Sequence, residues 1–169
     1  FGKTKYVPDD FYSKMKAGKV FSYDVLLYKD GGKPGEFKPR IGMYGEGYPF
    51  GEFGINEHVF RLRSNTLGQP FLYYVVGSVR SFHELSTRGG KAAIPGVNQS
   101  DVKALDLAVP CEELIYQFNQ IAHCHMESIL KNASISLGLS RLRDTLLPKL
   151  ISGELRIPDA EKLLAEAAL

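Results

Sequence analysis

The feature that most constrains this chain is a heptad pattern of apolar side chains in its C-terminal third. From residue 112 onward, ten positions recur at alternating spacings of three and four residues. Seven are apolar, namely Leu114, Phe118, Ile121, Ile135, Leu139, Leu142 and Leu146. His125, Ser128 and Asn132 occupy the remaining three. We call these ten positions the seam, and the spacing predicts one long α-helix of coiled-coil type.

The predicted helix covers residues 112 to 147, ends at Pro148 and would be ~54 Å long at about 1.5 Å per residue. A small domain cannot bury a stripe of that length, so we expect part of the seam to face another helix. Polar seam residues cost stability but often set register and partner choice. The predicted helix-pairing residues are Leu114, Phe118, Ile121, His125, Ile135, Leu139, Leu142 and Leu146.

The segment before this helix has the pattern of an irregular α/β (α+β) domain with a small mixed sheet. Expected strands cover residues 20–28, 37–44, 55–63 and 105–110, and a helix is expected from about 70 to about 85. In the third strand Phe60 and Leu62 should face one way, and Val59, Arg61 and Arg63 the other. A loop with a short strand is expected over residues 86–98. The resulting division is a domain at 1–110, a helix region at 111–157 and a tail at 158–169.

Charge and composition narrow the class of protein. Net charge is only +2, but residues 1–50 hold nine Lys/Arg against six Asp/Glu, while residues 111–169 hold six against eight. No apolar run approaches the roughly 20 residues of a membrane span, and the N-terminus has no signal-peptide core. We therefore expect a cytoplasmic protein without membrane contact. Because the sequence starts at Phe1 rather than Met, we also expect a piece of a longer protein.

Two glycine-containing loops carry the candidate ligand-binding cations. The first holds Lys29, Lys33, Lys38 and Arg40 within twelve residues. Such cations would contact DNA phosphates while one or two side chains reach base edges. The alternative is a solvated loop in which acidic neighbours cancel half of the charge. The second loop offers Arg88 and Lys91, with ordinary surface as the alternative.

Aromatic and amide side chains give further candidates. Tyr44, Tyr48 and Phe50 lie among glycines, where they could touch thymine methyl groups or, as we favour, fill a small core. Asn98 could bond an adenine edge, as could Gln99, but Asn98 is better placed as a helix cap, a role that Ser100 could also fill.

Nothing in the pattern indicates catalysis or a metal site. Cys111 and Cys124 lie thirteen residues apart on one predicted helix, too far for a disulfide. His123 and His125 point to different helix faces, so a metal site is not favoured. Phosphate-loop, dinucleotide-binding, GxSxG and HExxH motifs are missing from the sequence. We expect no catalytic activity and no cofactor in this chain.

Three stretches resemble one known family. They are LRDTLLPKLISGEL at the end of the long helix, VNQSDVKALDLAVP before it, and YDVLLYKDGGKPGEF with INEHVFRLR at the front. Together they resemble the specificity subunit of type I restriction-modification enzymes, and the resemblance covers residues 20 to 157. The match is to one target-recognition domain plus one conserved helix, as in the C-terminal half of such a subunit.

The resemblance implies a fold, partners and a role. In the family two target-recognition domains each read one half of a bipartite DNA site, and their conserved helices pair antiparallel. Separate methyltransferase and restriction subunits carry out the chemistry, so S-adenosylmethionine is expected in the methyltransferase partner. The implied partners are double-stranded DNA, methyltransferase subunits, indirectly the restriction subunit, and a second half subunit or a second copy of this chain. The rival interpretation is a coiled-coil adaptor without DNA contact.

Overall fold

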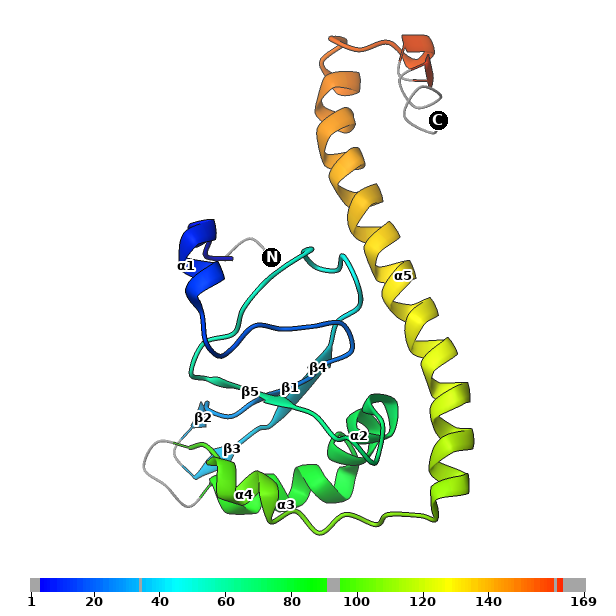
Figure 1. Cartoon of the computed structure of the whole chain (residues 1–169). Coiled ribbons are helices and arrows are strands. Elements are labelled where there is room, and N and C mark those ends of the chain that lie inside the picture. Colours follow the sequence, from blue (N-terminus) through cyan, green and yellow to red (C-terminus); the bar gives the residue numbers. More distant parts are fainter. Residues whose placement is uncertain (1–3, 34, 91–94, 160, 163–169) are drawn as a thin grey trace. The chain divides into compact units, whose positions relative to one another are not determined.

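The computed structural model describes residues 4–33, 35–90, 95–159 and 161–162 (Figure 1). It confirms the α+β class, with small antiparallel sheets and one long C-terminal helix. Backbone contacts divide the chain into two compact units, Phe1–Leu130 and Lys131–Leu169. Among the described helices, none has the length and apolar character that crossing a bilayer requires.

A three-stranded antiparallel sheet forms the centre of the first unit. β1 (Val25–Tyr28) lies between β4 (Arg40–Met43) and β5 (Val59–Leu62), as Figure 1 shows. Leu27 is paired with Ile41 on one side and with Phe60 on the other. β2 (Gly32–Lys33) and β3 (Glu36–Phe37) form a separate two-stranded hairpin. The first strand was predicted over residues 20–28. It begins only at Val25, because residues 21–24 form a turn.

One face of the sheet is buried by helices α2 (Gln69–Val76) and α3 (Val79–Gly89). Its side chains alternate with those of the other face, because successive residues of a strand point to opposite sides. The helix-covered face carries Val25, Leu27, Ile41, Met43, Phe60 and Leu62. The opposite face carries Leu26, Tyr28, Arg40, Gly42, Val59 and Arg61. The predicted alternation is thus confirmed over Val59–Leu62, but the strand is shorter than the expected range of residues 55–63.

The prediction of a single helix over residues 70 to 85 is wrong, because the structure has two helices in this region. It breaks after Val76, and α3 begins anew behind Ser78, whose side chain accepts a hydrogen bond from the backbone N–H of Ser81. Gly77 is a poor helix former and Ser78 is a good N-cap, so the two together favour an end and a restart. Val79 consequently lies outside the buried stripe and is 89% exposed.

The connection between α3 and the long helix also differs in part from expectation. Asn98 does cap α4 (Gln99–Lys103), and its side chain and that of Asp101 form a reciprocal capping box. The strand expected over residues 105–110 is absent, and this segment is irregular. In place of a short strand after residue 86, the described residues form only a bridge between Asp30 and Gly96. A short helix that the sequence did not predict, α1 (Asp9–Lys14), lies near the N-terminus.

Helix α5 runs over Glu112–Ile151 and begins where the sequence predicts. Its predicted end before Pro148 is wrong, since the helix includes Pro148 and continues to Ile151. Proline removes only one intrahelical donor, and in the last turn the backbone N–H of Ser152 still bonds to the carbonyl of Pro148. The chain turns away near Gly153, whose φ of +77° is accessible to glycine at low cost.

Within the first unit, α5 is fixed by a face that does not coincide with the seam. Ile115, Ala122 and Met126 are buried. Between them Asn119 accepts a hydrogen bond from the N–H of Phe71 (2.9 Å) and donates one to the carbonyl of Leu67 (2.8 Å). These bonds join α5 to the start of α2 (Figure 1).

Candidate nucleic-acid interface

Two of the four predicted cations of the first loop are exposed on the β2–β3 hairpin. Lys33 ends β2 opposite Glu36 in the ladder, and Lys38 forms an ion pair of 2.9 Å with the same Glu36. Glu36 therefore compensates one of the two cations directly, as the solvated-loop alternative foresaw. Because both lysines remain exposed, their ammonium groups stay accessible to an anionic ligand.

The other two cations lie on aromatic rings of the sheet. The Lys29 ammonium is 5.3 Å from the centroid of the Phe60 ring, and the Arg40 guanidinium carbon is 5.3 Å from that of Tyr28. Such cation–π contacts hold a cation without neutralising it. Arg40 begins β4 on the sheet face opposite α2 and α3, so it does not share a surface with the helix-covered side.

The fold brings the two predicted loops together. The backbone N–H of Gly31 bonds to the carbonyl of Pro95 (3.0 Å), and that of Val97 bonds to the carbonyl of Lys29 (2.8 Å). A Cβ on Gly90 would lie 3.1 Å from the carbonyl oxygen of Gly35, which shows how closely the two segments pass. Lys91 lies outside the described residues.

Arg88 is not on a loop, and this part of the prediction is wrong. It occupies the last turn of α3, donates to the Glu84 carboxylate at 2.5 Å and also donates to the carbonyl of Ala104 at 3.1 Å. The hydrogen bond from Arg88 lowers the pKa of Glu84 below its ordinary value. Arg88 therefore directs two of its five N–H donors to partners within the fold.

Tyr44 and Tyr48 belong to a half-buried aromatic cluster. Their ring centroids are 6.4 Å apart, and Tyr44 also meets Phe53 edge-on at 5.4 Å. Phe50 extends the cluster, with its ring 6.4 Å from that of Phe53. The rings pack against one another, but none of the three belongs to the buried core of the sheet and helices, and each keeps part of its surface in solvent.

A buried acid with two arginines was not among the predicted site residues. Asp24 is only 2% exposed, and its carboxylate accepts two hydrogen bonds from Arg63, one of them at 2.7 Å. Its hydrogen bonds with Arg63 raise the pKa of that guanidinium. Arg61 approaches the same carboxylate at 4.0 Å and donates to the backbone carbonyl of Lys19. The alternation in 55–63 placed both arginines on one side, but nothing local in the sequence indicated Asp24 as their partner.

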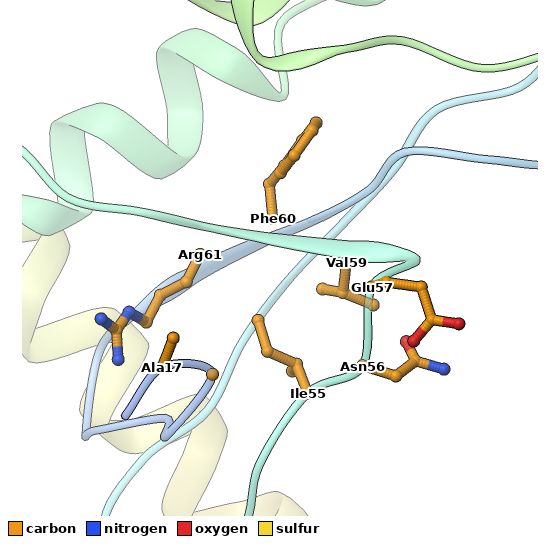
Figure 2. A pocket seen from close by; sticks show the side chains of 8 residues that line it. Ala17, Ile55, Asn56, Glu57, Val59, Phe60 and Arg61 are labelled. Carbon is orange, nitrogen blue, oxygen red and sulfur yellow. The ribbon is translucent and has the colours of Figure 1, made fainter. Parts of the chain in front are cut away.

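An open pocket of about 370 Å³ lies beside Arg61 (Figure 2). Its lining includes Ala17, Ile55, Asn56, Glu57, Val59 and Arg61. Figure 2 shows Phe60 pointing away from Val59, to the other side of the strand. In the described part of the chain no three His, Cys, Asp or Glu residues are grouped as a metal site would require. Cys111 and Cys124 are free and exposed.

The predicted helix-pairing residues are mostly exposed on α5. Leu114, Ile121, Ile135, Leu139 and Leu142 are all exposed, with Leu139 at 61%, and so is His125. Leu146 is partly exposed. Phe118 keeps 38% of its surface in solvent and meets the rings of Phe71 and Tyr74 edge-on, each at 5.6 Å.

Comparison with known proteins gives one informative similarity. No family model matches the sequence, and no solved structure matches the fold. The type I restriction enzyme MjaIX specificity subunit of Methanocaldococcus jannaschii is 26% identical over 113 residues. The match covers 66% of this chain and 26% of that protein, so the chain corresponds to about a quarter of its relative. The chain is therefore similar over most of its length to part of a type I restriction enzyme specificity subunit.

Proposed function

We propose that this chain is a DNA sequence-specificity module of a type I restriction-modification system. It reads one half of a bipartite target through residues 1–110, and it docks methyltransferase subunits and a second helix through residues 111–157. The chain itself is non-catalytic, it acts in the cytoplasm, and S-adenosylmethionine binds to the methyltransferase partner. The observation that carries the proposal is the 113-residue similarity to a specificity subunit.

The arrangement of the first unit supports a role in DNA reading. Exposed lysines lie on the hairpin, and a second glycine-containing segment passes directly beside it. The test is a domain exchange in the complex reassembled with methyltransferase subunits. Replacing residues 20–105 by those of a differently specific homologue should change the methylated sequence. An unchanged target would show that another part of the complex reads the DNA.

Phosphate contacts can be separated from base contacts by salt dependence. Lys33→Ala and Arg40→Ala should each weaken binding to all duplex sequences and lower the slope of log K against log salt by about 1. A gel-shift titration over several salt concentrations measures both quantities. If either variant instead changes base preference, that residue reads sequence. If the unaltered chain shows no salt-dependent affinity, the adaptor interpretation replaces the proposal.

The charge distribution along α5 favours antiparallel pairing of two copies. Residues 112–130 contain Glu112, Glu113 and Glu127 and no Lys or Arg, a net charge of −3. Residues 131–151 contain four Lys/Arg against one Asp, a net charge of +3. Antiparallel pairing places each acidic half beside a basic half, whereas parallel pairing places like charges together.

The seam also selects one antiparallel register. Centring the pair on residue 130 sets every seam position opposite another, because each pair of residue numbers then sums to 260. The apolar pairs are Leu114 with Leu146, Phe118 with Leu142, and Ile121 with Leu139. His125 faces Ile135, and Ser128 faces Asn132. Ser128 and Asn132, two of the three polar seam residues, therefore meet near the two-fold axis, where they would oppose shifted registers.

Cysteine cross-linking tests this register. In a background with Cys111→Ser and Cys124→Ser, one preparation carries Ser128→Cys and another carries Asn132→Cys. Mixing and oxidising the two should give a cross-link between unlike chains, because position 128 of one chain faces position 132 of the other, whereas two copies of the same position do not face each other. Each preparation alone is the control and should cross-link poorly. Efficient cross-linking within each preparation would instead indicate parallel pairing.

A further inference from the structure

A strained turn presents an aromatic ring to solvent on the first unit. In turn 21–24 the N–H of Asp24 bonds to the carbonyl of Phe21 (3.0 Å), and Tyr23 has a φ of +65°. That conformation is costly for a residue other than glycine. Three further bonds hold it: Tyr23 N–H to the Tyr44 carbonyl, Gln69 to the Tyr23 carbonyl, and Phe21 N–H to the Asp24 carboxylate. The product is a Phe21 side chain that is 58% exposed.

Two guanidinium groups flank this ring. The guanidinium carbon of Arg63 lies 4.8 Å from the centroid of the Phe21 ring, and that of Arg61 lies 5.8 Å away. Both arginines project from the end of β5, and Asp24, directly before β1, holds Arg63 in place. Carboxylate bonding and ring contacts therefore hold the exposed cluster of Phe21, Arg61 and Arg63 in a defined position.

The cluster keeps a net positive charge and free donor capacity. Two guanidiniums face one carboxylate, and each guanidinium has five N–H donors, of which Arg63 directs two to Asp24. The Arg63 side chain is 44% exposed and that of Arg61 is 28% exposed. An ion pair that served stability alone would need neither the second arginine nor an exposed ring between them.

We infer that Phe21, Arg61 and Arg63 form a contact surface for duplex DNA, in which the guanidiniums bind phosphate oxygens and the Phe21 ring packs on base edges. Planar guanidiniums fit phosphate groups, and apolar side chains contact thymine methyl groups in the major groove. Arg40 lies on the same face of the sheet as Arg61, which extends the positive surface towards β4. This inference rests on the proposed function, because it assigns DNA contacts that the two loops did not include.

The test measures binding of the full 169-residue chain to a fluorescent random-sequence duplex at several salt concentrations. Arg61→Gln should lower the slope of log K against log salt by about 1, because it removes one phosphate contact. Phe21→Ala removes no charge, so it should weaken binding at an unchanged slope. Arg63→Lys keeps a cation beside Asp24 and should weaken binding severalfold, also at an unchanged slope.

The matched control is Arg80→Gln. Arg80 lies on α3 in an exposed ion pair with Asp106, so this variant also removes one paired arginine. It should bind DNA as the unaltered chain does. Thermal melting of each variant shows that loss of binding is not loss of folding, and the exposed position of Phe21 makes Phe21→Ala the variant least coupled to the fold.

The outcomes separate the inference from the proposed function. If the unaltered chain binds DNA and Arg61→Gln and Phe21→Ala bind equally well, the inference is wrong and the proposed function stands. If Arg61→Gln and Arg80→Gln reduce the salt slope equally, the effect comes from the total charge of the protein and not from a contact at Arg61, and the inference is also wrong. If the unaltered chain shows no salt-dependent affinity, the proposed function itself is contradicted.

Discussion

The two halves of α5 share one seam but differ in what the chain covers. In residues 112–130, Ile115, Ala122 and Met126 are buried, and Asn119 is bonded to α2 and the loop before it. In residues 131–151 no residue is buried. The first half therefore has two faces, one packed within its own unit and one exposed, whereas the second half offers only exposed or half-exposed positions.

The helix therefore carries two apolar faces that differ in exposure. The face with Ile115, Ala122 and Met126 stabilises the fold of a single chain. The seam, which starts one residue earlier at Leu114, is mostly exposed, and we propose that another molecule covers it. The two faces can be tested separately, because substitutions on each should affect different measurements.

The largest effect is expected from a charge on the seam. Leu139→Asp should shift the chain from dimer to monomer at micromolar concentration, because each dimer would bury two unpaired carboxylates. Sedimentation or light scattering measures the mass. Ser136→Asp, exposed and outside the seam, is the control and should leave the mass unchanged. A Leu139→Asp protein of unaltered mass would refute pairing through the second half.

A smaller effect, on folding rather than on association, is expected on the other face. Ile115→Ala should lower the free energy of unfolding by about 2–4 kcal/mol, because it leaves a cavity inside the first unit, on the buried face of α5. Denaturant unfolding followed by circular dichroism measures it. Leu139→Ala is the matched control, since its loss should appear in the dimer dissociation constant. Equal destabilisation of the monomer by both variants would abolish the distinction between the faces.

The Asn98 cap gives a third test, located in the first unit. Asn98→Ala should cost about 1 kcal/mol of stability, since the N–H of Asp101 loses its acceptor. Thermal unfolding measures the loss, and Gln99→Ala serves as the control. DNA target preference should stay the same in both variants. A changed preference for Asn98→Ala would show that this amide reads a base.

The smallest effect is expected on the pH dependence of stability, through the ionisation of Glu84. Its pKa lies below the ordinary value of 4.5, chiefly because Arg88 donates to the ionised carboxylate. The stabilisation it contributes is therefore complete above about pH 4.5 and is lost as pH falls through the lowered pKa. Glu84→Gln should flatten the acid side of a plot of melting temperature against pH. An unchanged acid side in Glu84→Gln would contradict the assigned pKa direction.

Much of the fold could be predicted from the sequence where the signal is local. The start of α5, the alternation of Phe60 and Leu62 with Arg61, and the Asn98 cap each depend on residues within one or two turns or one strand. Gly77 and Ser78 are also local signals for a helix break. The regular spacing of apolar residues across them nevertheless favours one continuous helix, so the break was not predicted. The prediction of a strand at 105–110 was wrong because a strand forms only beside another strand, and composition does not show whether such a neighbour is present.

Less of the candidate site could be predicted. The cations of the first loop were identified, but the sequence could not show that Glu36 pairs with Lys38 or that Arg88 belongs to a helix. The cluster of Phe21, Arg61 and Arg63 was missed because Phe21 lies about 40 positions before the two arginines and contacts them only in the folded chain, where Asp24 holds Arg63. An aromatic residue three positions before an aspartate is too common a pattern to indicate such a site.

The long helix, its seam and the uneven charge along it follow from residue spacing and composition, because helical periodicity places residues three and four apart on one stripe whatever surrounds them. Which stripe of α5 is buried, which loops adjoin and which arginines share the buried acid follow only from the folded chain. These choices depend on contacts between segments distant in the chain, and their free energy exists only when the segments meet.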